Sequence, residues 1–82
     1  MDEQNQETGM LTYGEKAVGL TFNPSGYECV DYVKKEFAKL IDVMEELRYM
    51  CNNTEQERLA TVAITELQTA QMWVVKVLTW QD

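Results

Sequence analysis

The sequence predicts an all-α protein in which a short N-terminal helix packs on a hairpin of two long antiparallel helices. Two long stretches carry this prediction, because their apolar residues recur every three or four positions, as the buried face of a helix requires. Only a few residues join the two stretches, so the helices must run antiparallel. Together they carry more apolar surface than a chain of 82 residues can cover. We therefore expect a homo-oligomer.

The first ten residues are polar and acidic and lack apolar periodicity, which predicts a disordered tail over residues 1–10. Residues 11–82 then form a single helical-hairpin domain. The polar opening predicts neither a signal peptide nor a membrane span. Cys29 and Cys51 fall near opposite ends of one predicted helix, too far apart for a disulfide within the chain. These features favour a reducing cytoplasm.

The first predicted helix runs from about Tyr13 to Leu20. Thr12 and Glu15 have the spacing of a capping box, in which a hydroxyl and a carboxylate satisfy free N–H groups at a helix start. Gly14 and Gly19 weaken this helix, each by about 1 kcal/mol relative to alanine. We expect it to form only when it is docked on the rest of the chain.

The second predicted helix follows the turn at residues 21–26, which contains the one proline of the chain. Ser25 and Glu28 form a second predicted capping box, and the helix continues to about Cys51. Its predicted buried seam has alternating spacings of three and four. The seam consists of Val30, Val33, Phe37, Leu40, Met44, Leu47 and Cys51.

The last predicted helix starts at a third capping box, Thr54 and Glu57, and its stretch from Leu59 to Trp80 contains no proline or glycine. It is apolar nearly all round toward its end, so several neighbours must cover it. The first apolar stripe is Ala60, Ala63, Leu67, Ala70, Val74 and Val77, and the second is Leu59, Val62, Trp73 and Trp80. We expect Trp73, Val74, Val77 and Trp80 to lie in a subunit interface.

The charge balance limits the possible functions. Seven basic and fourteen acidic residues give a net charge of −7, which argues against binding to DNA, RNA or anionic membranes. The chain has no histidine, no phosphate-cradling glycine loop and no cysteine spacing that suits zinc. We therefore expect no catalytic residues, no metal and no cofactor, and a binding protein is favoured over an enzyme.

A few residues could bind an anion. Asn23 and Ser25 precede a long helix, where free N–H groups attract negative charge, although capping alone would also explain them. Arg58 stands in the first turn of the last helix, where the helix dipole disfavours a cation, so a phosphate or carboxylate ligand would stabilise it. Glu55 or Glu57 could equally pair with it. Arg48, near a helix C-terminus, needs no functional explanation. Tyr13 could stack on a base or serve as a core anchor.

The order of these pieces resembles a known family. The run from Gly14 to Gly26, with Phe-Asn-Pro-Ser-Gly at its end, and the later run Met-Trp-Val-Val-Lys at residues 72–76 are the most specific parts. They are similar to the phage anti-CBASS cyclic-oligonucleotide sponges, whose hairpin domain is shared with an anti-Thoeris sponge for a cyclic ADP-ribose isomer. The resemblance covers about residues 11–80. It implies a non-enzymatic homohexamer that encloses cyclic dinucleotides between subunits, with separate pockets for cyclic trinucleotides in some members.

The resemblance also assigns roles to residues. Tyr13 occupies the place of the aromatic residue that stacks on a base, and Arg58 matches a basic residue that meets phosphate. The turn residues that line the pocket are Asn23, Pro24, Ser25 and Gly26. Lys16 and Thr61 are further candidates nearby. Glu28 departs from the pattern, because the family is expected to carry a lysine soon after the glycine of the turn, and here the first lysine is Lys34.

The resulting hypothesis is a phage-encoded immune-evasion protein that acts in the cytoplasm of the infected bacterial host. It binds cyclic di- or trinucleotides without cleaving them, so that CBASS effectors are not activated. Two alternatives stay open. One is an anti-Thoeris sponge for a cyclic ADP-ribose isomer. The other is a helical protein-interaction adaptor without a small ligand, which would grip a host protein through Trp73 and Trp80.

Overall fold

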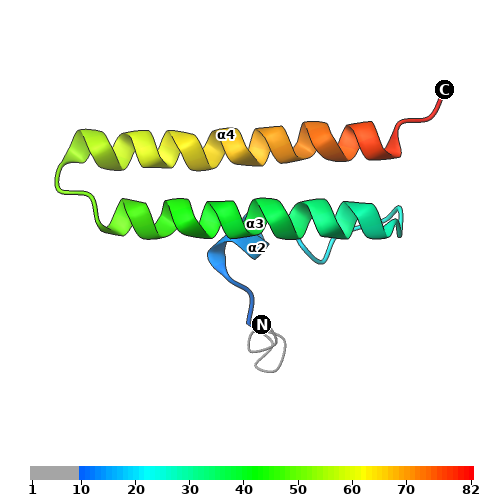
Figure 1. Cartoon of the computed structure of the whole chain (residues 1–82), viewed down its shortest axis with the longest axis horizontal. Coiled ribbons are helices and arrows are strands. Elements are labelled where there is room, and N and C mark those ends of the chain that lie inside the picture. Colours follow the sequence, from blue (N-terminus) through cyan, green and yellow to red (C-terminus); the bar gives the residue numbers. More distant parts are fainter. Residues whose placement is uncertain (1–9) are drawn as a thin grey trace.

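The computed structural model describes residues 10–82, and all regular secondary structure within that range is helical. The predicted disordered tail, residues 1–10, lies outside the described part of the chain except for Met10. Three helices follow in order: α2 (Tyr13–Ala17), α3 (Glu28–Tyr49) and α4 (Thr54–Thr79). Figure 1 shows α3 and α4 side by side and antiparallel, with α2 packed against α3. The all-α class and the helical hairpin are thus confirmed.

Helix α2 begins as predicted. The N–H of Glu15 donates to Thr12 Oγ1 at 3.1 Å, and the N–H of Thr12 donates to Glu15 Oε1 at 2.8 Å, which completes the capping box. The predicted end at Leu20 is wrong, because Gly19 takes a left-handed φ of 65°. The N–H of Gly19 then bonds to the Lys16 carbonyl and that of Leu20 to the Glu15 carbonyl, the pattern of a Schellman motif. This motif ends α2 at Ala17.

The start of α3 corrects the second predicted capping box. The helix begins at Glu28 and its N-cap is Tyr27, which makes no side-chain cap bond. Ser25 cannot be the N-cap, because Gly26 has a φ of 72° and no helix can pass through that conformation. The Ser25 hydroxyl instead accepts a hydrogen bond from the N–H of Tyr27 within the turn.

The start of α4 corrects the third predicted box. Its N-cap is Asn53 rather than Thr54, because the Asn53 side chain accepts a 2.8 Å bond from the N–H of Gln56. The Gln56 side chain in turn accepts from the N–H of Asn52. Asparagine is at least as good an N-cap as threonine, so the helix starts one residue earlier than the predicted cap allows. The helix itself ends at Thr79, close to the predicted Trp80.

The buried faces differ from the predicted seams. On α3 the buried residues are Val30, Lys34, Ala38 and Ile41, and on α4 they are Ala60, Ile64 and Gln71. Leu40 and Leu47, which belong to the predicted α3 seam, are exposed, and Val77 on α4 is 73% exposed. The reason is that α3 packs against α2 as well as α4, so its buried arc is rotated toward both neighbours. A helix that is apolar over a wide arc does not reveal which part of it faces inward.

The core is small. Val18, Ala38, Ile41 and Ile64 form one buried cluster that joins the C-cap of α2 to α3 and α4. Cys29 and Cys51 are free thiols. In the part of the chain that the structure describes, no helix is long and apolar enough to cross a membrane.

Candidate functional site

Two pockets lie at opposite ends of the hairpin. The first, here the turn pocket, has a volume of about 600 Å³ and lies between the N-terminal segment, α3 and the C-terminal half of α4. It is lined by Lys16, Ala17, Val18, Gly19, Phe22, Asn23, Pro24, Ser25, Val30, Lys34, Gln68, Gln71, Met72, Val75 and Thr79. The second, here the loop-end pocket, has about 540 Å³ and is lined by Glu45, Arg48, Tyr49, Thr54, Glu57, Arg58 and Thr61.

The side chain of Asn23 organises the turn at one wall of the turn pocket. Its Nδ2 donates to the carbonyl of Tyr27 at 2.9 Å and to Asp31 Oδ1 at 3.0 Å. Its Oδ1 accepts from the Ser25 hydroxyl at 2.6 Å and from the N–H of Gly26 at 3.2 Å. One amide therefore ties the turn to the first turn of α3.

Lys34, a buried residue of α3, hydrogen-bonds to the segment that forms the same wall. It is only 6% exposed, and its Nζ donates to the carbonyl of Gly19 at 2.9 Å and to the carbonyl of Phe22. The ammonium also lies 5.6 Å from the centre of the Phe22 ring, within range of a cation–π interaction. Because the ion pairs of the described residues do not include Lys34, its charge faces carbonyl dipoles and no carboxylate.

The charges that line the turn pocket are of one sign. Among residues 10–82, Lys16 and Lys34 line it and no carboxylate does. The side chain of Lys16 is exposed and makes no hydrogen bond or ion pair with residues 10–82. A pocket with two positive charges and no negative one stands out in a chain whose net charge is −7. It is therefore a suitable place for an anion.

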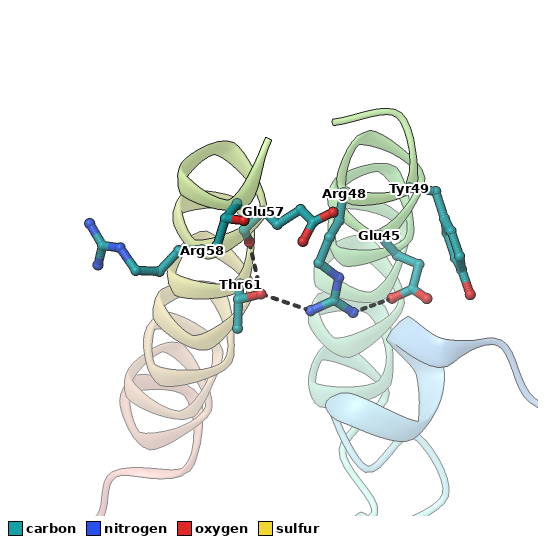
Figure 2. Close-up of a pocket in the computed structure, with 7 residues that line it drawn as sticks. Glu45, Arg48, Tyr49, Glu57, Arg58 and Thr61 are labelled. Atoms are coloured by element: carbon teal, nitrogen blue, oxygen red, sulfur yellow. Dashed lines mark hydrogen bonds and ion pairs between the residues drawn. The ribbon is translucent and has the colours of Figure 1, made fainter. Parts of the chain in front are cut away.

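Arg48 is the central residue of the loop-end pocket (Figure 2). Its Nη2 donates to Glu45 Oε1 at 2.8 Å, and its Nη1 reaches across to α4 and donates to Thr61 Oγ1 at 3.1 Å. The guanidinium also lies 5.6 Å from the centre of the Tyr13 ring. The Tyr13 side chain, and after it Glu45, raise the pKa of Arg48 above its usual value. Arg48 thus links α2, α3 and α4.

Arg58 faces away from this arrangement. Figure 2 shows its side chain on the outer side of α4, pointing away from α3. Its Nη2 lies 2.7 Å from Glu55 Oε2, and this hydrogen bond lowers the pKa of the exposed Glu55 carboxyl. The pairing with Glu55 that the sequence left open is therefore present. The two arginines of the pocket are balanced by Glu45 and Glu57 among its lining residues.

The structure divides the predicted binding residues into two groups. Lys16, Asn23, Pro24 and Ser25 line the turn pocket. Arg58 and Thr61 line the loop-end pocket. Tyr13 does not line it, but its ring is next to the guanidinium of Arg48, which does. Gly26 lies in the turn but lines neither pocket. On α3 the nearest lining residues of the two pockets, Lys34 and Glu45, are about 17 Å apart at about 1.5 Å per residue. Tyr13 and Lys16, one from each group, lie within one turn of each other on α2.

Sequence reasoning missed two charged residues of these pockets. Arg48 was explained by its place near a helix C-terminus, yet it contacts three other side chains. Lys34 was noted only as the first lysine after the turn, yet it is buried beneath it. A signal for Lys34 exists in the sequence, because it lies four residues after Val30 and four before Ala38, on one helical face with both.

The predicted interface residues lie toward the C-terminal end of α4. Trp73 is 61% exposed and Trp80 is 67% exposed, while Val74 is half-buried. Lys76 lies 5.4 Å from the centre of the Trp73 ring and covers part of it. Large apolar side chains that remain this exposed are a suitable surface for another protein chain.

Comparison with known proteins gives one match. The family model described as Acb2/Tad1, hairpin domain, matches residues 15–79. This range includes the turn, both long helices and all the residues that line the two pockets. Neither a curated protein nor a solved structure matches the chain.

Proposed function

Because the chain belongs to the Acb2/Tad1 hairpin-domain family, we propose that it is a sponge for cyclic oligonucleotide second messengers. In this proposal the phage-encoded protein acts in the cytoplasm of the infected bacterium. It binds cyclic dinucleotides, and cyclic trinucleotides in further pockets, and holds them without cleaving them. CBASS effectors are then deprived of their activator.

The turn pocket is the observation that carries this proposal. Its two lysines, with no carboxylate among the described residues that line it, suit a ligand with negative phosphodiesters. Its volume of about 600 Å³ falls within the range of small-molecule sites, which is about 300–1,000 Å³. The acidic remainder of the chain repels long polyanions, which need an extended basic surface. A small anion held in one pocket avoids that repulsion.

The lysines of the turn pocket also bear on the difference from the family pattern at Glu28, where a lysine was expected near the turn. A lysine was expected soon after the glycine of the turn, but Glu28 does not line the pocket. Lys16 approaches from α2 and Lys34 from α3, so positive charge is supplied from other positions. We therefore propose that Glu28 does not abolish dinucleotide binding.

The loop-end pocket is proposed as a second contact for the ligand. Tyr13 would stack on a base, and Arg48, Arg58 and Thr61 would approach phosphate. The lining residues of the two pockets lie toward opposite ends of α3, so we propose that one ligand contacts the turn pocket of one subunit and the loop-end pocket of another. A homohexamer, with ligands enclosed between subunits, provides such contacts. The interface would include Trp73, Val74, Val77 and Trp80.

The proposal is tested by ligand binding and by particle mass. Melting temperatures are measured with cyclic dinucleotides, cyclic trinucleotides and cyclic ADP-ribose isomers, because a ligand that binds only the folded state raises the melting temperature. Light scattering gives the mass of the particle. We expect a shift with a cyclic oligonucleotide on a particle of about six chains. Denaturing the complex should release the nucleotide intact; a linear or hydrolysed product would contradict a sponge.

A matched pair of variants assigns the site. Lys16→Gln removes a charge from the turn pocket, whereas Lys35→Gln removes the same charge from α3 outside it. We expect Lys16→Gln to weaken binding at least tenfold and Lys35→Gln to leave it nearly unchanged. A shift with a cyclic ADP-ribose isomer alone would support the anti-Thoeris alternative. No shift with any nucleotide, on a monomer or dimer, would favour the adaptor.

A further inference from the structure

The side chain of Gln71 is buried without a partner. It is 4% exposed, comes from the middle of the C-terminal half of α4 and lines the turn pocket. Its side-chain amide forms no hydrogen bond with residues 10–82. Among these residues, every side-chain nitrogen or oxygen that is closed off from solvent has a hydrogen-bonding partner. Because the Gln71 amide has no partner, its nitrogen and oxygen cannot be closed off, and they must reach the open space of the pocket.

An amide at this depth needs a hydrogen-bonding partner that residues 10–82 do not supply. Only water or a bound group in the pocket can pair with it, whereas an apolar side chain of the same length would need neither. The surroundings suit an apolar residue, because Val18, Val30 and Val75 line the same pocket. The amide is thus explained best by a group that enters the pocket and pairs with it.

The other lining groups indicate what that group is. Phe22 and Met72 are both exposed and line the pocket, so they offer apolar surface to a planar ring. Lys16 offers a charge to the phosphate that would accompany the ring. A primary amide presents one donor and one acceptor side by side. The Hoogsteen edge of adenine, with its N6–H donor and N7 acceptor, is complementary to it, whereas the same edge of guanine presents two acceptors.

We propose that Gln71 pairs with the base of the bound nucleotide in the turn pocket and makes this site selective for adenine over guanine. The inference rests on the proposed function, since it requires that the turn pocket takes a nucleotide. It assigns selectivity to Gln71 and general affinity for the anion to Lys16, which contacts no base in this arrangement.

The test compares Gln71→Met with Gln68→Met. Methionine has nearly the length of glutamine and lacks the amide, and Gln68 lies one turn earlier on α4 at the same pocket but is only half-buried. Calorimetry measures the affinities for cyclic di-AMP and cyclic di-GMP. Wild type should prefer cyclic di-AMP by about tenfold or more, the usual effect of a bidentate base contact. Gln71→Met should lose this preference, and Gln68→Met should keep it.

A melting experiment without ligand checks the premise. Gln71→Met and a second apolar variant, Gln71→Leu, should melt no lower than wild type, since no hydrogen bond of the free protein is lost. A marked fall in both variants would overturn the inference, because it would mean that the amide has a structural partner.

Failure of this inference is distinguishable from failure of the proposed function. If wild type binds cyclic oligonucleotides and Gln71→Met binds them with the same affinities and the same base preference, the role of Gln71 is overturned and the sponge stands. Equal or tighter binding of cyclic di-GMP by wild type also overturns it. If wild type binds no cyclic oligonucleotide, the proposed function fails and the role of Gln71 fails with it.

Discussion

The backbone N–H of Gly14 donates a 2.7 Å hydrogen bond to Oδ1 of Asp42, and the two residues fix where α2 sits on α3. Gly14 is buried against the α3 backbone, and a Cβ built on it would lie 2.1 Å from the carbonyl oxygen of Ala38. Only glycine allows this approach. Tyr13 and Lys16 lie close to Gly14 on α2. The contact of Gly14 with α3 therefore also sets the positions of Lys16, at the turn pocket, and of Tyr13, beside the loop-end pocket.

Replacing Gly14 by alanine should therefore destabilise the protein even though alanine is the better helix former. The added methyl group meets backbone atoms that cannot move aside, and overpacking of this kind costs about 1–3 kcal/mol. Urea unfolding measures the loss. Lys16→Ala, at an exposed position of the same helix, is the control and should change the stability little. Equal stability of Gly14→Ala and wild type would show that α2 does not dock in this way.

Replacing Asn23 by alanine should loosen the turn. The substitution removes four hydrogen bonds in which the Asn23 side chain takes part. Because the site is partly exposed, water can replace some of them, and we expect a loss of about 1–2 kcal/mol in unfolding free energy. Ser25→Ala removes only the two bonds of a hydroxyl group and should cost less. A larger loss for Ser25→Ala would contradict the central role of Asn23.

Replacing Lys34 by methionine tests whether the buried ammonium holds the turn. The variant keeps the apolar stem but leaves the carbonyls of Gly19 and Phe22 without their donor. Unpaired carbonyls of this kind cost about 1–3 kcal/mol, so the melting temperature should fall by several degrees. Lys35→Met, at the exposed neighbouring position, should have little effect. If both variants melt alike, the bonds of Lys34 to the turn do not contribute to stability.

The pair of Glu55 and Arg58 predicts a pH dependence. The bond from Arg58 lowers the pKa of Glu55 in the folded protein below 4.5, the usual value. A lowered folded-state pKa contributes stability above the unfolded pKa, and that contribution is lost as the pH falls through the folded value. Both side chains are exposed, so the contribution is small and weakens with salt. An NMR titration should find Glu55 below 4.5 in wild type and nearer 4.5 in Arg58→Gln.

The same titration tests the predicted role of Arg58 in ligand binding. If Arg58 turns from Glu55 to a phosphate, the pKa of Glu55 should rise toward its usual value when the protein is saturated with ligand. An unchanged Glu55 titration in the complex would place Arg58 outside the ligand contacts.

Adding charge to the exposed end of α4 should reduce the size of the particle. Trp73→Glu and Trp80→Glu place a carboxylate on the predicted interface, where burial in an oligomer would be unfavourable. Light scattering should show a lower mass for both variants at the same protein concentration. Asn52→Glu, which adds the same charge at an exposed position in the link before α4, is the control. An unchanged mass in both tryptophan variants would place the interface elsewhere.

Some local features of this fold could be predicted and others could not. The capping box of Thr12 and Glu15 was predicted correctly, because its two bonds involve residues three positions apart. The boxes at Ser25 and Thr54 were wrong for two different reasons. The left-handed φ of Gly26 excludes Ser25 as the N-cap of α3. At α4 the Asn53 side chain accepts from the N–H of Gln56 and takes the N-cap position one residue before Thr54. Spacing alone does not distinguish between neighbouring residues that can both cap a helix.

The sequence by itself determined the two long helices, the short link between them and their antiparallel arrangement, since these follow from local periodicity and chain length. Only the tertiary structure decided that Lys34 and Gln71 lie buried, that Arg48 rather than Arg58 bridges the helices, and that the candidate residues fall into two pockets. The physical reason is that α3 packs against α2 and α4 at once. Which arc of a broadly apolar helix is buried depends on both partners, and their positions are set by contacts such as that of Gly14 with Asp42.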